Sequence, residues 1–124
     1  MVKAFLKSPA KINLSLKIGK KINHEYHDIQ SIIFLTSLHD QIVIKKINGQ
    51  KDKFKFTGKF KKNIKLENNS ALKSVYFLRK KNIINNRSKY EIKIKKNIPV
   101  FSGLGGGSSN AATIIKYFYK KRKI

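Results

Sequence analysis

Several kinds of residue are missing or rare in this sequence of 124 residues. It has no cysteine, which excludes disulfides, thiolate metal sites and a thiol nucleophile. It has two prolines, no Pro/Ser-rich linker and no internal repeat, so about one domain is expected. No apolar stretch approaches the roughly 18 residues of a membrane span, and the start, MVKAFLKSPA, lacks the long apolar segment of a secretory signal. A cytoplasmic protein is the simplest expectation.

Acidic residues are also scarce. The sequence has six Asp and Glu and 29 Lys and Arg, which gives a formal net charge of +23. Such a balance is typical of proteins that neutralise nucleic-acid phosphates. However, only three of the 29 basic residues are arginine, and the lysines are spread along the whole chain. Lysine, isoleucine and asparagine are abundant together, as A/T-rich codons would produce. Because phosphate and base recognition usually exploits the planar fork of arginine, we favour compositional drift over nucleic-acid binding.

Alternating apolar and polar residues, the pattern of a half-buried strand, recur along the chain. Strands are predicted at 3–7, 11–18, 40–47, 52–58 and 89–100. The apolar, β-branched segment 29–38 is interpreted as a strand that pairs with 40–47. Polar residues at 19–28 predict a loop, and NGQK at 48–51 predicts a turn.

Two later segments, 68–82 and 108–123, have helical periodicity instead. Asn69 or Ser70 can cap the first helix, and basic residues at the end of the second suit the helix dipole. The predicted apolar faces are Leu72, Val75 and Tyr76 in the first helix, and Ala111, Ile114, Ile115 and Phe118 in the second. Strands followed by a helix, a strand and a helix indicate an α+β fold, with helices packed on one face of a mainly antiparallel sheet.

Four of the seven glycines lie in one stretch, PVFSGLGGGSSNAAT at 99–113, between the last strand and the last helix. Helix N-termini offer unpaired N–H groups and partial positive charge, and glycines let a phosphate approach the backbone. The alternative, a flexible linker, seldom opens directly onto an amphipathic helix. The stretch is not a Walker loop, because no lysine follows the glycines before Lys116. It also departs from the dinucleotide fingerprint, which has Gly or Ala where Ser108 stands and needs an acid, absent after Glu91.

The stretch from Pro99 to Ala112 resembles the ATP-binding motif of the GHMP small-molecule kinases. Its triple glycine followed by Ser-Ser-Asn-Ala-Ala is similar to one branch, the 4-diphosphocytidyl-2-C-methyl-D-erythritol kinases of the non-mevalonate isoprenoid pathway. SPAKINLSL at 8–16 resembles the N-terminal strand of that branch, and EYHDIQSI at 25–32 resembles its Gly-Tyr-His substrate segment. The resemblance covers essentially this whole chain but about the N-terminal half of such an enzyme. It implies a ribosomal-protein-S5-domain-2-like fold, with 1–124 a C-terminally truncated GHMP kinase N-terminal ATP-binding domain and the C-terminal domain absent.

The resemblance also implies ATP and Mg²⁺ as cofactors and a small-molecule substrate with a cytidine diphosphate group. Lys11 matches the active-site lysine of the family, Asn13 is expected to orient the substrate, and Tyr26 and His27 match the residues that hold the cytosine. Glu25 stands where the family has glycine. The residues expected to bind the ATP phosphates are Pro99, Gly103, Leu104, Gly105, Gly106, Gly107, Ser108, Ser109 and Asn110, with Ser108 also the candidate Mg²⁺ ligand.

One expected catalytic residue has no match in the sequence. The family has its aspartate in a Gly-Ala-Asp-Val-Pro-like segment after this helix, and no motif assigns that role to Asp28, which lies beside His27. We therefore expect an ATP-dependent kinase for a hydroxyl of 4-diphosphocytidyl-2-C-methyl-D-erythritol, inactive without its missing half or a partner chain, and no membrane association. Two alternatives stay open: a basic RNA- or DNA-binding domain on the same fold, and a degenerate remnant without activity.

Overall fold

A computed structural model of the chain describes residues 3–21, 27–64, 69–99 and 106–122; of these, 12–21, 27–34 and 63 are described by their backbone only. The strands are β1 (Lys3–Lys21), β2 (His27–Ile47), β3 (Lys53–Thr57) and β4 (Lys89–Lys95). The helices are α1 (Ser70–Lys80), α2 (Gly106–Arg122) and the short 3-10 helix η1 (Lys61–Asn63). A membrane crossing would need a longer and more apolar helix than any in these described ranges.

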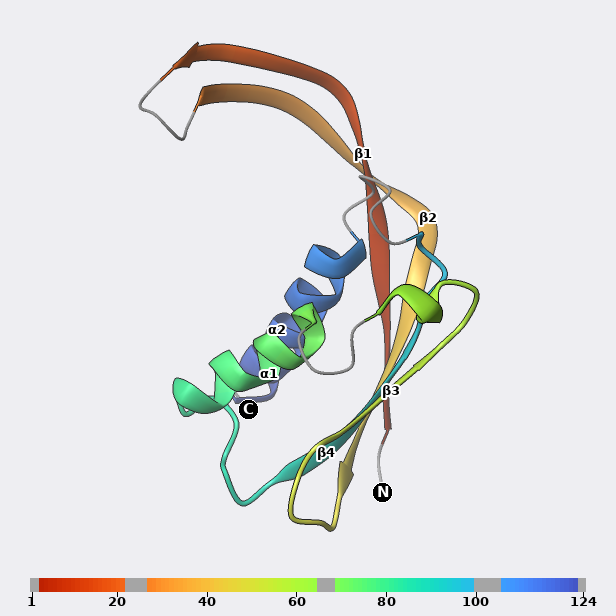
Figure 1. Ribbon diagram of the computed structural model, residues 1–124. Coiled ribbons are helices and arrows are strands. Elements are labelled where there is room, and N and C mark those ends of the chain that lie inside the picture. Colours follow the sequence, from red (N-terminus) through yellow and green to blue (C-terminus); the bar gives the residue numbers. More distant parts are fainter. Residues whose placement is uncertain (1–2, 22–26, 65–68, 100–105, 123–124) are drawn as a thin grey trace.

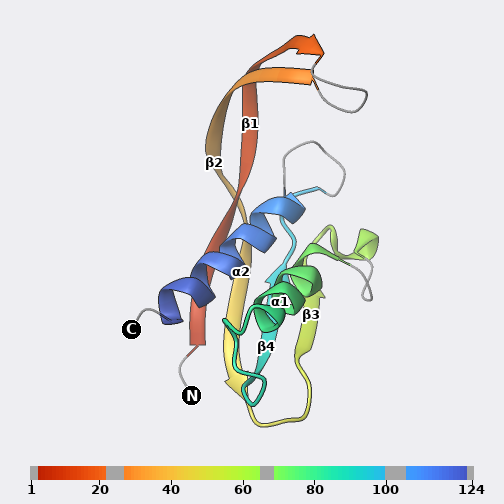
Figure 2. The same ribbon diagram turned by 90° about the vertical axis from the view of Figure 1, so that its left-hand side faces the viewer.

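The strands form one sheet in the order β1-β2-β4-β3. β2 pairs antiparallel with both β1 and β4, whereas β3 runs parallel to β4. The two α-helices lie side by side on one face of this sheet (Figures 1 and 2). The expected mainly antiparallel sheet with helices on one face is therefore confirmed, with one parallel edge strand added.

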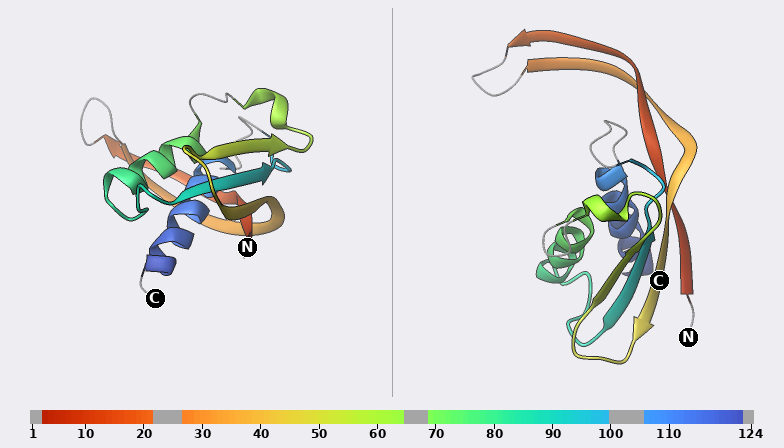
Figure 3. Two further views of the ribbon diagram at one scale, coloured as in Figure 1. Left: turned by 90° about the horizontal axis from the view of Figure 1, so that it is seen from below. Right: turned by 45° about the vertical axis from the view of Figure 1, so that its right-hand side comes forward.

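β1 and β2 form a two-stranded ribbon that extends well beyond the helices. Its ladder has register shifts between Pro9 and Lys11, between Asn13 and Ser15, and between Ile18 and Lys21. Such irregularities bend a strand and increase its twist. The far part of the ribbon accordingly curves toward the side on which the helices lie (Figures 1 and 3).

One prediction about this ribbon was wrong. Segments 29–38 and 40–47 are not a pair of strands but consecutive parts of β2, and their partner is β1. Only His39 lies between the two segments, which is fewer than the two residues of the tightest common hairpin loop. Residues 48–51 connect β2 to β3 as predicted, and β4 lies between these two strands in the sheet.

The core lies between the sheet and the two helices. Alternation in β2 and β4 directs Ile42, Ile44, Ile92 and Ile94 toward the helices, and all four are 1% exposed or less. The helices contribute Ala71, Val75, Leu78, Ile114 and Phe118 to the same cluster. Tyr90 meets Phe118 edge to face, with ring centroids 4.9 Å apart, an arrangement that aromatic pairs favour.

Helix α1 begins as predicted but turns a different face to the core. Asn69 is the N-cap, and its Oδ1 accepts a hydrogen bond of 3.1 Å from Leu72 N. Tyr76, predicted on the apolar face, is 68% exposed. Ser74 is buried instead, because its hydroxyl donates to Ala71 O at 2.7 Å and so needs no water.

Candidate functional site

The site is built around the first turn of α2, which starts at Gly106 and packs against the buried Ile98. A Cβ added at Gly106 would lie 3.0 Å from Ile98 Cγ2, closer than normal packing allows. The next residue, Gly107, is held by Ser70, whose hydroxyl donates to Gly107 O at 2.7 Å. The N-terminus of α2 is thus fixed both against the segment that follows β4 and against the start of α1.

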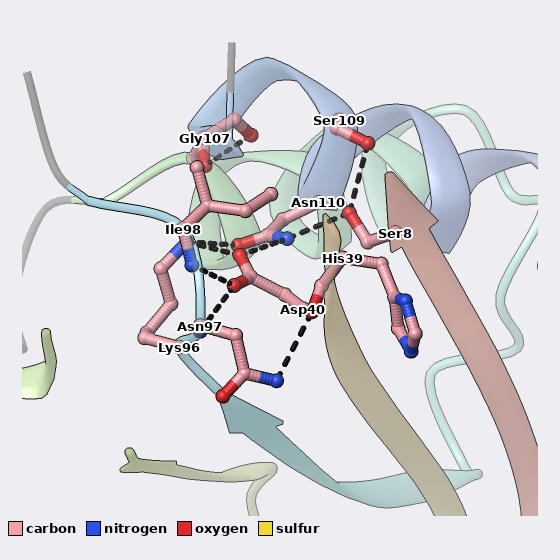
Figure 4. Close-up of polar contacts among 10 residues, drawn as sticks. Ser8, His39, Asp40, Lys96, Asn97, Ile98, Gly107, Ser109 and Asn110 are labelled. Carbon is pink, nitrogen blue, oxygen red and sulfur yellow. Dashed lines mark hydrogen bonds and ion pairs between the residues drawn. The ribbon is translucent and has the colours of Figure 1, made fainter. Parts of the chain in front are cut away.

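Beside this first turn lies a carboxylate without contact to solvent. Asp40, on β2, is 0% exposed, and its Oδ2 lies 2.5 Å from Lys96 Nζ (Figure 4). Its Oδ1 accepts hydrogen bonds from the backbone N–H groups of Asn97, at 2.6 Å, and Ile98, at 2.9 Å. Lys96 is itself only 2% exposed, so this is an ion pair inside the protein. Removing two charges from water is costly, and further hydrogen bonds offset that cost: Asp40 accepts from two backbone N–H groups, and the Lys96 ammonium also donates to Asn110 Oδ1.

Asn110 connects this ion pair to β1. Its Nδ2 donates to Asp40 Oδ2 at 3.0 Å and to Ser8 Oγ at 2.7 Å, while its Oδ1 accepts from Lys96 Nζ at 2.8 Å (Figure 4). Ser8 in turn donates to Ser109 Oγ at 2.9 Å. In the part of the chain that the structure describes, no buried side-chain polar atom lacks a partner. The network therefore joins β1, β2, the segment after β4 and α2 into one rigid support.

A cavity of about 280 Å³ opens on the other side of the same helical turn. It is lined by Pro9, Lys11, Leu35, Ser108, Ser109, Ala112, Thr113 and Lys116. Lys11 is half-buried and comes from β1, beside the register shift, whereas both serines come from the first turn of α2. The fold thus brings Lys11 together with Ser108 and Ser109, although about a hundred residues separate them in the sequence.

The remaining predicted site residues fall into three groups. Pro99 and Gly106 to Asn110 are described, and of these Asn110 is buried in the network rather than open to the cavity. Asn13 and His27 are described by their backbone, paired with Ile33 and Lys21 respectively. Outside the described residues lie Glu25, Tyr26, Gly103, Leu104 and Gly105.

Sequence reasoning missed the buried network. A signal was present, since Lys96 continues the inward series of Ile92 and Ile94, and Asp40 precedes Ile42 on the inward side of β2. An ionisable residue at a core-facing position needs a buried partner of opposite charge. Asp40 and Lys96, 56 residues apart, satisfy each other in this way.

Known proteins resemble this chain in both sequence and fold. Residues 69–122 match the GHMP kinases N terminal domain. The chain is 43% identical over 120 residues to the 4-diphosphocytidyl-2-C-methyl-D-erythritol kinase of Pelagibacter ubique, covering 96% of this chain and 41% of that protein. It is 37% identical over 121 residues to the enzyme of the same name from Thermosipho melanesiensis, covering 98% of this chain and 41% of that protein.

Two solved structures share the fold. A crystal structure of 4-(cytidine 5'-diphospho)-2C-methyl-D-erythritol kinase matches with a TM-score of 0.70 and 25% identity, covering 96% of this chain and 41% of that one. Mevalonate pyrophosphate decarboxylase from Streptococcus pyogenes matches with a TM-score of 0.65 over 98% of this chain and 38% of that one. Because the two sequences are only 16% identical, this match shows that the fold is shared and no more.

A sheet with helices on one face, a glycine-led helix and the sequence match over 69–122 define the class that this chain resembles, the N-terminal domain of the GHMP kinases. In sequence it is similar to the 4-diphosphocytidyl-2-C-methyl-D-erythritol kinases, and it spans about 41% of the length of these relatives. The resemblance to these kinases and the fold class are thereby confirmed.

Proposed function

We propose that this chain supplies the nucleotide-binding part of an ATP-dependent kinase that phosphorylates a hydroxyl of 4-diphosphocytidyl-2-C-methyl-D-erythritol. The observation that carries the proposal is the cavity that Lys11 shares with Ser108 and Ser109 at the start of α2. The relatives at 37–43% identity, all kinases named for this substrate, support the choice of substrate.

The residues around the cavity fit a phosphate group. Unpaired N–H groups and partial positive charge at the start of α2 favour an anion there. Lys11 and Lys116 add two ammonium groups, and the described residues lining the cavity include no Asp or Glu. Ser109 Oγ accepts the hydrogen bond from Ser8, so its own proton is available to donate toward the cavity.

The chemistry of phosphoryl transfer depends on positioning and on neutralising charge. ATP would supply the transferred phosphoryl group, held by Pro99 and 103–109, whereas Asn110, buried in the network, would support these residues from behind. The Lys11 ammonium stabilises the charge that develops on the transferring group and on the attacking hydroxyl. The Ser108 hydroxyl is an oxygen ligand of the kind that Mg²⁺ takes alongside phosphate oxygens. Asn13, Tyr26 and His27 remain the proposed contacts to the substrate.

Asp40 is not the general base of this reaction. Both of its oxygens are occupied, by the Lys96 ammonium, the Asn110 amide and two backbone N–H groups, and its side chain is 0% exposed. A general base must reach the proton that it removes. We therefore assign Asp40 to support of the first turn of α2, and we propose that the base comes from outside the described residues.

The test is ATP-dependent phosphorylation of 4-diphosphocytidyl-2-C-methyl-D-erythritol by the complete protein, with variants of the cavity residues. Lys11→Met is expected to lower kcat by about 10²–10³-fold, the usual effect of removing one preorganised charge or donor. Ser108→Ala is expected to raise the Mg²⁺ concentration needed for half-maximal rate. Lys7→Met is the matched control, because Lys7 is an exposed lysine of the same strand that does not line the cavity.

Survival of full activity in both Lys11→Met and Ser108→Ala would refute the site assignment. A complete protein that folds but neither binds ATP nor turns over substrate would instead favour a degenerate remnant. Thermal unfolding followed by circular dichroism establishes that each variant is folded before its kinetics are interpreted.

A further inference from the structure

The sheet face opposite the helices has an unusual composition. Alternation along the strands divides each one into helix-facing residues and residues on this second face. Cross-strand pairing arranges the second face in three rows: Lys3, Lys45, Glu91 and Lys53; then Phe5, Val43, Lys93 and Lys55; then Lys7, Gln41, Lys95 and Thr57. We call these twelve residues the open face. Seven of them are lysines and one is an acid.

No described segment covers the open face. The views along and across the sheet place both α-helices on its other side (Figures 1 and 2). Lys93 and Lys55 have side chains that are 47% and 57% exposed, and Phe5 is 76% exposed. Neighbouring strands lie about 4.8 Å apart, so the four-stranded face is roughly 14 Å wide. Every second residue along a strand is about 6.7 Å from the next, so the lysines on this face are closely spaced.

The one acid on the open face is surrounded by lysines. Glu91 lies 3.6 Å from Lys55 Nζ through one oxygen and 3.6 Å from Lys93 Nζ through the other. Partial burial works against its ionisation, but the charges of Lys93, Lys55 and Lys45 together hold the pKa of this carboxyl below its usual value. Even with Glu91 ionised, the face keeps a large excess of positive charge.

An exposed aromatic ring stands among these charges. Phe5 is the most exposed large apolar side chain among the described residues, and it pairs across the ladder with Val43. The phenyl ring offers a flat surface on which a nucleobase can stack. A sheet face that combines phosphate-neutralising charges with an exposed ring is suited to unpaired nucleotides.

We propose that the open face binds single-stranded nucleic acid, with the lysines on the phosphates and a base stacked on Phe5. A flat, four-stranded face does not enter the major groove of a duplex, which admits a helix or a two-stranded ribbon. An acidic protein would use the lysines but would have no equivalent of the stacked base. The open face and the first turn of α2 lie on opposite sides of the sheet, so this activity goes beyond the proposed kinase reaction.

Fluorescence anisotropy of short labelled oligouridylate and oligothymidylate, titrated with the full chain at several salt concentrations, tests the proposal. The triple variant Lys45→Gln, Lys55→Gln, Lys93→Gln is expected to bind at least about tenfold more weakly. Its dependence of log K on log salt should be shallower by about 2, since each single-strand phosphate contact contributes about 0.7. The matched control removes three exposed lysines from the helix side, as Lys73→Gln, Lys80→Gln, Lys120→Gln.

A second pair of variants isolates the aromatic contribution. Phe5→Ala is expected to weaken binding by about fivefold to a hundredfold, the range for loss of one stacked base. Tyr76→Ala, which removes a 68% exposed ring from α1, is expected to leave binding unchanged. Lys11→Met, which alters the cavity beside α2, should also leave oligonucleotide binding unchanged, so a failure here is distinguishable from a failure of the kinase proposal.

Four results would overturn the inference. Equal losses in the two triple variants would mean attraction by net charge alone. Unchanged binding by Phe5→Ala would mean a site for polyanions in general, such as acidic proteins. Duplex bound as tightly as single strands would exclude the stacking arrangement, and loss of binding in Lys11→Met would place the contact in the cavity instead.

Discussion

Replacement of Asp40 by Asn is the sharpest test of how the first turn of α2 is held in place. The change keeps the shape of the side chain but removes the charge that faces Lys96. The Lys96 ammonium, 2% exposed, then has only amide oxygens as partners. Breaking a buried pair by neutralising one member costs about 3–5 kcal/mol, because the other charge stays uncompensated.

A loss of this size is a large part of the about 5–15 kcal/mol that stabilises a typical domain. Lys96→Met should be less harmful, because Asp40 would keep three N–H donors, from Asn97, Ile98 and Asn110. The double variant should lose less than the sum of the two single changes, since the two side chains contact each other directly.

Urea unfolding followed by circular dichroism measures these differences, with the m-value as a check that the unfolded state has not changed. The control is Glu91→Gln, which neutralises a carboxylate whose ion pairs with Lys55 and Lys93 lie outside the buried network and should cost less. A loss below about 1 kcal/mol for Asp40→Asn, or strictly additive single and double variants, would refute the buried-pair reasoning.

Two further predictions concern the sheet. Gly58→Ala should destabilise the fold by more than about 1 kcal/mol, because Gly58 has φ +93° and an added Cβ would lie 2.5 Å from Lys96 O. Thermal unfolding measures the loss, and Gly49→Ala is the control because the nearest atoms to a Cβ there are 3.9 Å away. Because the folded pKa of Glu91 lies below its usual 4.5, its ionised form stabilises the fold above that pH, and this contribution is lost as pH falls through the folded pKa. Glu91→Gln should therefore be less stable than the parent at pH 7 and equal to it in acid, and a difference that persists in acid would show that the charge is not responsible.

The sequence predicted those parts of the fold that depend on local periodicity. Ile92 and Ile94 alternate as a half-buried strand should, and Asn69 caps α1 as expected. The continuity of β2 was not predicted, because the hydrophobic pattern of 29–38 does not indicate which strand pairs with it. The exposed position of Tyr76 was missed because burial of Ser74 depends on a hydrogen bond within the helix, and hydrophobicity does not report it.

In the candidate site, too, the features set by neighbouring residues could be predicted, and those set by long-range contacts could not. The glycine-led helix and its anion-binding character follow from neighbouring residues, and the structure has α2 begin at Gly106. The meeting of Lys11 with Ser108 depends on contacts between the two ends of the chain, and only the family resemblance pointed to it. Asp40 and Lys96 carried a signal at their inward positions, but their pairing requires β2 and the segment after β4 to be neighbours.

The buried Asp40 also dictates an order of events during synthesis. β1 and β2 are both complete once residue 47 has been made, yet the partners of Asp40, Lys96 and Asn110, follow 56 and 70 residues later in the sequence. At about 5–20 residues per second, the carboxylate waits about 4–14 s for Asn110 to be added. During that time it must remain hydrated, so the ribbon cannot bury its inner side. We expect water to leave this part of the core only after Lys96 and Asn110 have both been added.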